Sequence, residues 1–526
     1  MKEVNKMQKK IIALLLMFAM AFALMAGCSN NTTEPVGTQA SDVSTGSNET
    51  QPAQDVKVED TAEKTVTITI GVPELGKGWP EKQEDDFVHA AILAATNVDV
   101  QLIPIDEYYT SLNVQLTGGT APDFFQADFN NMKTYVDQGL IKSIDAYKSD
   151  LDSVLSYLGE NYDNWTLYVD DEMYAFPYGN ADTANYYGIY VRQDFLDTLD
   201  CAAPTTVDEL YDFCVNAKDK NLSGLDTTIA LGGKGWYPYD MIASTYGVHL
   251  GNYVIIEDGK VTNMLLNENM EKALTAVKKF QDAGLIDSET FNGGNGGKNM
   301  RTGYVAIGSN QWVPIWKQTY LNTLYEVNPN ASWSLVEPLK SNIGTGSEPF
   351  GVVDYNSNGC SKFVVNESTS DEKIAAFVRV LKWLATEEGK MTSWLGIQGT
   401  HWDYVDGKAT VLEGMADSIN YISTYQMIGR NDQEYMDMKF PEASAAIAHG
   451  QNMTRVTKYN AMLDVPDTIY LDDMNTYVND QLLAFIKGER PISEYRDFIN
   501  ELYNIYDLQA YMDVATEQLT EKGLVK

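Results

Sequence analysis

The chain has few cysteines, few histidines and few basic side chains. Its 526 residues include four Cys and four His, and 38 Lys and Arg stand against 74 Asp and Glu, which gives a formal net charge of -36. A strongly negative protein repels the phosphates of nucleic acid, so the composition argues against nucleic acid as a partner. The His and Cys residues show no metal-ligand spacing, and we expect neither a metal nor another cofactor.

Motifs of common enzyme classes are also missing. The sequence contains no H-E-x-x-H and no G-x-S-x-G. A glycine-rich stretch at 292–299 superficially resembles a phosphate-binding loop, but no Ser or Thr follows Lys298, which favours a flexible loop. Acidic pairs such as Asp170-Asp171 are too common in this chain to mark a glycosidase, and they lack the spaced ligands of a calcium loop. We therefore predict that the chain is not an enzyme.

Cysteine usage gives little evidence for disulfides. Apart from Cys28, the chain has Cys201, Cys214 and Cys360, an odd number in a chain too large to need cross-links. Cys214 lies on the apolar face of a predicted helix, which indicates that it fills the core. A bridge between Cys201 and Cys214 stays open.

The first 28 residues are typical of an export signal. Met1–Lys10 carries four lysines and one acid, Ile11–Leu24 has no polar side chain, and the run closes on Leu-Met-Ala-Gly-Cys28. The apolar run is too short to span a bilayer comfortably, and no other segment approaches the length of about 18 residues that a span needs. The closing residues resemble a bacterial lipobox, in which a diacylglycerol is attached to Cys28 and cleavage removes residues 1–27. An ordinary signal peptide or a retained anchor is the alternative.

The segment that follows predicts a disordered linker over residues 28–64. Ser29–Lys64 has no aromatic residue, no Leu and no Ile, so it cannot bury enough apolar surface to offset the entropy of ordering. Its mean reach of roughly 30–35 Å would let a folded body move above the membrane. We expect the protein at the extracellular face of the cell membrane, held to the bilayer by its lipid.

The body of the chain alternates predicted strands and helices. Strands are predicted at 66–71, 98–105, 123–127, 187–192, 228–232 and 305–309. Helices are predicted at 85–96, 106–116, 206–218 (opened by a Thr206–Glu209 capping box), 269–283 and 371–388, and 472–523 is expected to be largely helical. This alternation favours βαβ units, a mostly parallel sheet and an α/β fold.

Aromatic residues are plentiful, with 32 Tyr and 9 Trp. Several Trp follow glycines or predicted strands, where open α/β sheets bind ligands. A flat ring suits the C–H face of a sugar, while Asp, Asn, Gln and His can hold its hydroxyls. Packing under a loop is the alternative for any one ring, and Trp383 and Trp394 are expected in the core. The candidate ligand-binding residues are Trp79, Asp128, Tyr178, Tyr186, Trp236, Tyr237, Asp240, Trp312, His401 and Trp402.

Five further segments, in this order behind the lipobox, resemble motifs of one family, the extracellular solute-binding lipoproteins of ABC importers, in their sugar-binding, LipO-like group. They are Gly119-Thr-Ala-Pro-Asp123, Asp171-Glu-Met-Tyr-Ala-Phe-Pro177, Tyr190-Val-Arg-Gln-Asp194, Ala203-Pro-Thr-Thr-Val-Asp-Glu209 and Gly396-Ile-Gln-Gly-Thr-His-Trp402. The chain departs from the family pattern at Glu172, where Gly is usual, and at Gln398 and Trp402, which replace Glu and Tyr.

The resemblance implies a two-lobed, periplasmic-binding-protein-like α/β fold with a hinge crossed more than once and a ligand cleft between the lobes. Lobe one is expected at 65–185 plus 351–395, and lobe two at 186–350 plus 396–526. Closure around the ligand would follow contacts to both lobes. The closed monomer would then dock on the ABC permease subunits in the membrane.

The resulting hypothesis is a membrane-anchored binding protein that captures a small-molecule ligand, an oligosaccharide, for an ABC import permease. A peptide-binding protein of the same fold is the first alternative, because aromatic clefts also accept apolar side chains. A surface-anchored glycoside hydrolase is the second, and the missing catalytic constellation argues against it.

Overall fold

The computed structural model describes most of the chain from Lys64 onward. The described residues are 64–76, 78–159, 164–179, 187–291, 295–311, 313–355, 362–412, 415–430 and 432–525. The predicted signal peptide, Cys28 and the linker up to residue 63 lie outside them, as do Tyr186, Trp312 and Cys360. None of the helices in the described ranges combines the length and apolar character that a membrane crossing needs.

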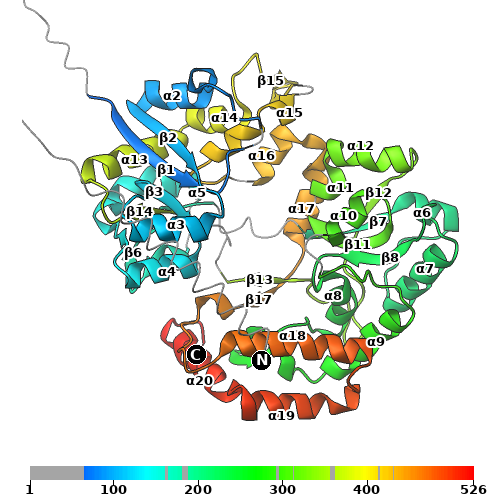
Figure 1. The fold of residues 1–526 in the computed structure, drawn as a ribbon. Coiled ribbons are helices and arrows are strands. Elements are labelled where there is room, and N and C mark those ends of the chain that lie inside the picture. The colour runs from blue at the N-terminus through cyan, green and yellow to red at the C-terminus, as the bar shows by residue number, and fades with distance from the viewer. Residues whose placement is uncertain are drawn as a thin grey trace, which may run out of the picture. The chain divides into compact units, whose positions relative to one another are not determined.

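The first sheet lies at the centre of lobe one (Figure 1). Its order is β2 (Val98–Pro104), β1 (Val66–Val72), β3 (Phe124–Ala127), β14 (Lys362–Asn366) and β4 (Ile141–Lys142). β1 pairs in parallel with β2 and β3, whereas β14 runs antiparallel to β3 and β4. The three strands predicted for this lobe are confirmed, and β14 is a later return of the chain to the same sheet.

Helices surround the first sheet. They are α2 (Phe87–Thr96), α3 (Tyr108–Thr117), α4 (Phe129–Asp137), α5 (Asp152–Leu158) and α13 (Asp371–Leu384), with the short elements η1 (Gln83–Asp85), η2 (Asp145–Leu151), η3 (Trp165–Leu167), β5 (Tyr168–Val169) and β6 (Glu172–Met173). The helix predicted over 371–388 ends at Leu384. Thr386 then begins a new helix, α14 (Glu387–Leu395), because its hydroxyl accepts a hydrogen bond from the backbone N–H of Gly389.

The second sheet is mixed. Its order is β12 (Trp333–Val336), β7 (Tyr187–Arg192), β11 (Val305–Gln311) and β8 (Ile229–Gly233). β11 and β8 are parallel, but β7 runs antiparallel to both β11 and β12. The expectation of a mostly parallel sheet is wrong here, because β7 enters from lobe one at the opposite end of the sheet, which needs no crossover helix.

The second sheet carries its own helices and a hairpin. They are α6 (Gln193–Leu199), α7 (Val207–Asp219), α8 (Tyr237–Ala243), α9 (Met270–Asp282), α10 (Asn295–Arg301), α11 (Val313–Trp316), α12 (Gln318–Val327), η5 (Ser244–Tyr246), η6 (Met264–Leu266), β9 (Val254–Glu257) and β10 (Lys260–Asn263). Thr206 begins α7 by accepting a hydrogen bond from the backbone N–H of Glu209, as the predicted capping box requires. The Glu209 carboxylate accepts two further bonds from Thr205.

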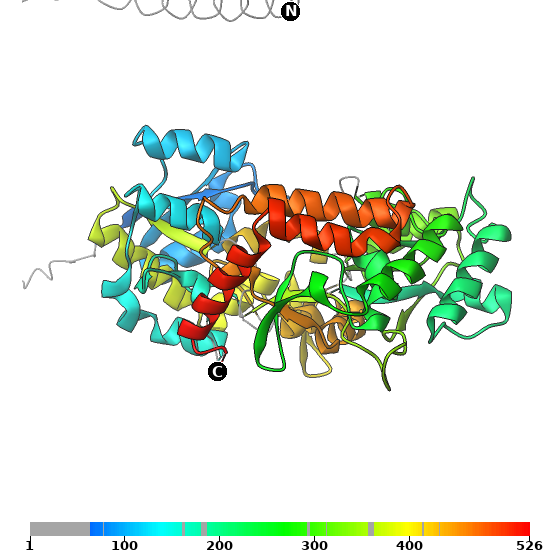
Figure 2. The same ribbon diagram turned by 90° about the horizontal axis from the view of Figure 1, so that it is seen from below.

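The C-terminal region is helical, as predicted. α18 (Leu471–Lys487), η10 (Ile492–Glu494), α19 (Tyr495–Ile505) and α20 (Leu508–Glu521) follow one another. α18 packs along α9, and α18 and α19 lie side by side in both views (Figures 1 and 2). Arg490, between these two helices, donates to Glu501 at 2.9 Å.

A group of connecting elements joins the two sheets. The strands β13 (Val352–Asp354) and β17 (Val456–Lys458) form a parallel pair. The other elements are α14, the hairpin β15 (Trp402–Val405) and β16 (Lys408–Val411), α15 (Met415–Ser418), η7 (Asn420–Tyr425), α16 (Asp432–Lys439), η8 (Pro441–Ala443), α17 (Ser444–Asn452) and η9 (Asn460–Met462).

The buried apolar side chains of the described residues form three hydrophobic cores. One lies under the first sheet, one joins the second sheet to the C-terminal helices, and the third joins α14, α16 and α17 to β7, β11 and β12 of the second sheet. Residues 419–428, expected in lobe two, pack their apolar side chains into the core of lobe one. Their burial corrects the predicted boundary: the chain enters lobe one again after α14.

The buried cysteine and tryptophans follow the sequence predictions. Cys214 is fully buried, and Trp383 and Trp394 lie in the cores. Cys201 and Cys214 are both free, so the open question of a bridge between them is answered in the negative for this structure.

Candidate functional site

Four predicted aromatic and acidic residues follow the carboxyl ends of sheet strands. In lobe one, Trp79 lies in the loop after β1, and Asp128 follows β3 directly. In lobe two, Trp236 follows β8, and Trp312 follows β11 at a position outside the described residues. The fold therefore carries the candidates of both lobes at the sheet ends where open α/β folds bind ligands.

Trp79 and His401 belong to one aromatic cluster. Trp79 stacks on Tyr425 with ring centroids 5.7 Å apart, and its edge meets Tyr421 at 5.5 Å. Phe87 connects His401 to these rings, because it contacts Tyr421 edge to face and stacks on His401 with centroids 4.9 Å apart. His401 is thus placed against lobe one, although the sequence assigned it to lobe two. Tyr421 and Tyr425 were missed, because their spacing resembles ordinary core packing.

Hydrogen bonds hold this cluster in place. The Tyr425 hydroxyl donates to the buried Asp86 carboxylate at 2.6 Å, and burial raises the pKa of this phenol. The His401 Nδ1 accepts from the backbone N–H of Ile397 at 3.0 Å, and burial lowers the pKa of His401, which favours the neutral ring. The cluster therefore offers a largely uncharged aromatic surface, of which Trp79 is only partly buried.

Trp402 is buried, contrary to the expectation that it contacts ligand. It is 5% exposed, its Nε1 donates to the Gly396 carbonyl at 3.0 Å, and its ring lies in the third core. The indole therefore fixes the turn before β15. The exposed ring of the hairpin is Tyr404, which meets Trp402 edge to face at 5.6 Å.

Asp128 caps α4, and Tyr178 lies at the end of lobe one. The Asp128 carboxylate accepts from the backbone N–H of Asn131 at 2.8 Å and from the Asn131 amide, so much of its hydrogen-bonding capacity is used. Tyr178 packs against the core of lobe one, and the next residue, Gly179, donates its N–H to the Ile428 carbonyl. Both side chains remain partly exposed.

The aromatic surface of lobe two centres on Trp236. Its ring meets Tyr239 and Phe291 edge to face, at 5.5 and 4.8 Å, and its Nε1 donates to the Asn479 side chain at 3.3 Å. Phe291 is 47% exposed and Trp236 is partly buried, so the pair is open to solvent mainly at Phe291. Phe291 was missed, because it stands beside a glycine-rich stretch with no aromatic pattern.

Tyr237 and Asp240, which follow Trp236 in α8, contact the interior of lobe two. Tyr237 stacks on Tyr187 with centroids 4.3 Å apart and planes 8° from parallel. Burial raises the pKa of Asp240 well above its usual range, and its carboxyl accepts the backbone N–H of Leu250 at 3.0 Å. Asp240 is 4% exposed, so the structure assigns it to the core and not to ligand contact, contrary to the sequence prediction.

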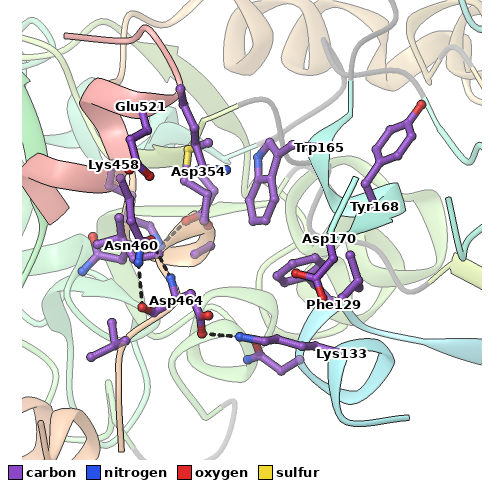
Figure 3. A pocket seen from close by; sticks show the side chains of 18 of the residues that line it. Phe129, Lys133, Trp165, Tyr168, Asp170, Asp354, Lys458, Asn460, Asp464 and Glu521 are labelled. Atoms are coloured by element: carbon purple, nitrogen blue, oxygen red, sulfur yellow. Dashed lines mark hydrogen bonds and ion pairs between the residues drawn. The ribbon is translucent and has the colours of Figure 1, made fainter. Parts of the chain in front are cut away.

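A large cavity of about 1160 Å³ lies where α4 and the segment around Trp165 face the C-terminal part of the chain (Figure 3). Lys133 forms an ion pair with Asp464 across it, and Lys458 pairs with Asp354 at 2.9 Å. The Trp165 Nε1 donates to the Tyr355 carbonyl at 2.7 Å. None of the predicted ligand-binding residues that the structure describes lines this cavity.

Two of the motifs noted in the sequence, those ending at Asp123 and at Asp194, have structural roles within the lobes. The Asp123 carboxylate accepts from the backbone and hydroxyl of Thr69 and from Lys373, which ties β3 to β1 and α13. Arg192 is fully buried, binds Asp194 through two nitrogens at 2.8 and 2.7 Å, and donates to a backbone carbonyl. These bonds hold the strands and helices of each lobe together.

Within the described part of the chain, no three His, Cys, Asp or Glu side chains are grouped to hold a metal ion.

Comparisons with known proteins agree with this architecture. No curated protein matches the sequence. Among solved structures, the HMO-binding, ABC-transporter-associated solute-binding protein of Bifidobacterium longum infantis has a TM-score of 0.64 at 14% identity, covering 86% of this chain and 98% of its own.

Two proteins of Streptococcus pneumoniae are similar to the same extent. The substrate-binding protein FusA, solved with kestose, has a TM-score of 0.64 at 16% identity and covers 88% of this chain and 100% of its own. The N-glycan transport protein NgtS has a TM-score of 0.61 at 15% identity, and the match covers 87% of this chain and 98% of NgtS. At such identities the likeness shows a common two-lobed fold. The model of one family, described as bacterial extracellular solute-binding protein, matches residues 88–401, more than half of the chain. The chain belongs to this family of bacterial extracellular solute-binding proteins.

Proposed function

We propose that the protein binds an oligosaccharide between its lobes and delivers it to an ABC import permease. The observation that carries this proposal is the pair formed by the exposed Phe291 and the partly buried Trp236 after β8, with the Asn479 amide at its edge. Exposed rings beside a polar amide suit the alternating C–H faces and hydroxyls of a sugar. The similar solved structures, one described as HMO-binding, one solved with kestose and one described as an N-glycan transport protein, support the same ligand class.

The proposed contacts come from both lobes. Lobe one contributes Trp79 with its cluster, including His401, together with the partly exposed side chains of Asp128 and Tyr178. Lobe two contributes Trp236, Phe291 and the edge of Tyr237, and we add Trp312 and Tyr186 from the sequence. A ligand that touches both sets favours the closed arrangement by its differential affinity for it.

A thermal-shift screen of the soluble chain tests the ligand class. HMO, kestose and N-glycan preparations are compared with a panel of short peptides. A ligand present at 100 times its dissociation constant stabilises the fold by about 2.7 kcal/mol. Stabilisation by a glycan and by no peptide supports the proposal, and stabilisation by peptides alone refutes it in favour of the peptide-binding alternative.

The same glycan separates binding from hydrolysis. Chromatography after hours of incubation with the protein is expected to return the glycan unchanged. Shorter products would identify a glycoside hydrolase, and the proposed transport role would then fail.

We also propose that Cys28 carries a diacylglycerol that holds the protein to the outer face of the cell membrane. The support is the lipobox-like Leu24–Cys28 behind a basic and apolar leader. Two acyl chains give stable anchoring because each buried methylene contributes about 0.8 kcal/mol. The polar stretch that follows would let the folded body reach the permease.

A further inference from the structure

Arg455 binds three separate parts of the backbone. It stands directly before β17, and its Nη1 donates to the Phe350 carbonyl at 3.0 Å. Its Nη2 donates to the carbonyls of Tyr187, at 3.0 Å, and of Gly450, at 2.6 Å. Hydrogen bonds from a charged donor are roughly twice as strong as neutral ones, so this guanidinium holds the three segments firmly together.

Two of these carbonyls lie at two of the points where the chain passes between the lobes. Tyr187 is the first residue of β7, where the chain arrives from lobe one. Phe350 lies in the core of lobe two, two residues before β13, on the way to β14 of lobe one. Gly450 belongs to α17, which packs against β7. Arg455 therefore ties the lobe-two ends of two crossing segments to one helix of that lobe.

The surroundings of Arg455 keep these ends rigid. Tyr187 stacks on Tyr237, and the backbone N–H of Gly351 donates to His249 Nε2 at 2.9 Å. Gly351 has a φ of +82°, and a Cβ at this position would lie 3.3 Å from Arg455 Nη1 and 3.5 Å from the Tyr237 ring. A glycine is thus required where the guanidinium and the phenol close on the backbone.

We propose that Arg455 is a positioning residue that sets the pivot of lobe movement. With these two crossing segments anchored at their lobe-two ends, Tyr187 and Phe350 move together with lobe two when the lobes change their orientation. The open form is then restricted to a narrow set of lobe orientations, so less conformational entropy is lost when a ligand closes the lobes. The benefit for binding rests on the proposed function, whereas the anchoring itself does not.

Hydrogen exchange on the ligand-free chain tests the anchoring. Arg455→Met removes the three bonds while keeping an unbranched side chain of similar length. We expect exchange at least tenfold faster in peptides covering 187–191 and 350–354, with the rest of the second sheet unchanged. Small-angle scattering should show a broader range of lobe separations. Arg455→Lys keeps the charge without the planar guanidinium. Its exchange rates in these two peptides should lie between those of the wild type and those of Arg455→Met.

Arg490→Met is the matched control, because it removes an Arg of the same lobe that bonds within the C-terminal helices. Its exchange should rise near α18 and α19 only. The proposal is overturned if Arg455→Met leaves the two peptides protected, or if protection falls equally throughout lobe two. If Arg455→Met does not fold, Arg455→Lys decides by the same criterion. A failed glycan screen with a local loss of protection would refute the proposed function and leave the pivot standing.

Discussion

His249 makes the stability of lobe two depend on pH. The ring is fully buried, and its Nε2 accepts the backbone N–H of Gly351 at 2.9 Å, which requires a neutral ring. Burial lowers the pKa of His249 to about 4 from its usual 6.5. Because the folded pKa is depressed, the unfolded chain binds the proton first as pH falls below 6.5, and stability is lost from there down to about pH 4.

The size of the effect follows from that shift. Each pKa unit corresponds to about 1.4 kcal/mol, so His249 removes about 3 kcal/mol from the free energy of unfolding between pH 7.5 and pH 4, and about 2 kcal/mol of it by pH 5. The matched variant is His249→Gln, which offers an acceptor to Gly351 and does not titrate. Asp240, whose pKa is also shifted by burial, is common to both proteins and cancels in the difference.

Urea unfolding at pH 7.5, 6 and 5 measures that difference. The stability of the wild type relative to His249→Gln should fall by about 2 kcal/mol from pH 7.5 to pH 5. A difference that stays constant with pH would refute the neutral, buried state of His249. A difference that changes in the opposite direction would mean that the ring is charged in the folded protein.

Three further predictions concern the tryptophans and the anchor. Trp394→Ala should lower the free energy of unfolding by about 3–5 kcal/mol in urea titration, because the ring is fully buried; a loss below 1 kcal/mol would contradict its core position. Trp236→Ala should weaken binding of a stabilising glycan about thirtyfold in calorimetry with little change in melting temperature, whereas Trp402→Ala should mainly destabilise the fold; the reverse pattern would place Trp402 in the site. Cys28→Ala should move the protein from the membrane fraction to the medium or stall its processing, and unchanged retention would exclude the lipid anchor.

Local pattern predicted the frame of both lobes well. The alternation in Val66–Val72 and the amphipathic spacing of 371–384 depend on neighbours in sequence, so periodicity found them. The direction of β7 and the lobe of residues 419–428 depend on where the chain arrives from, which no local pattern records. The placement of the rings shows the same limit. Trp236 and Trp402 both follow glycines, yet one is partly open and the other is buried under its own turn.

The late return of residues 419–428 to lobe one bears on how the chain folds. The core of lobe one closes through contacts such as Tyr425 with Asp86, which are 339 residues apart, and Lys373 with Asp123, 250 apart. The entropy of closing loops grows slowly with length, so the longer of these costs only about 1 kcal/mol more than a 100-residue loop. Contacts of this range nevertheless form late and slow the search for the native topology. During synthesis from the N-terminus, lobe one cannot complete its core until Ile428 has emerged, so its first strands remain without their last partners for most of that time.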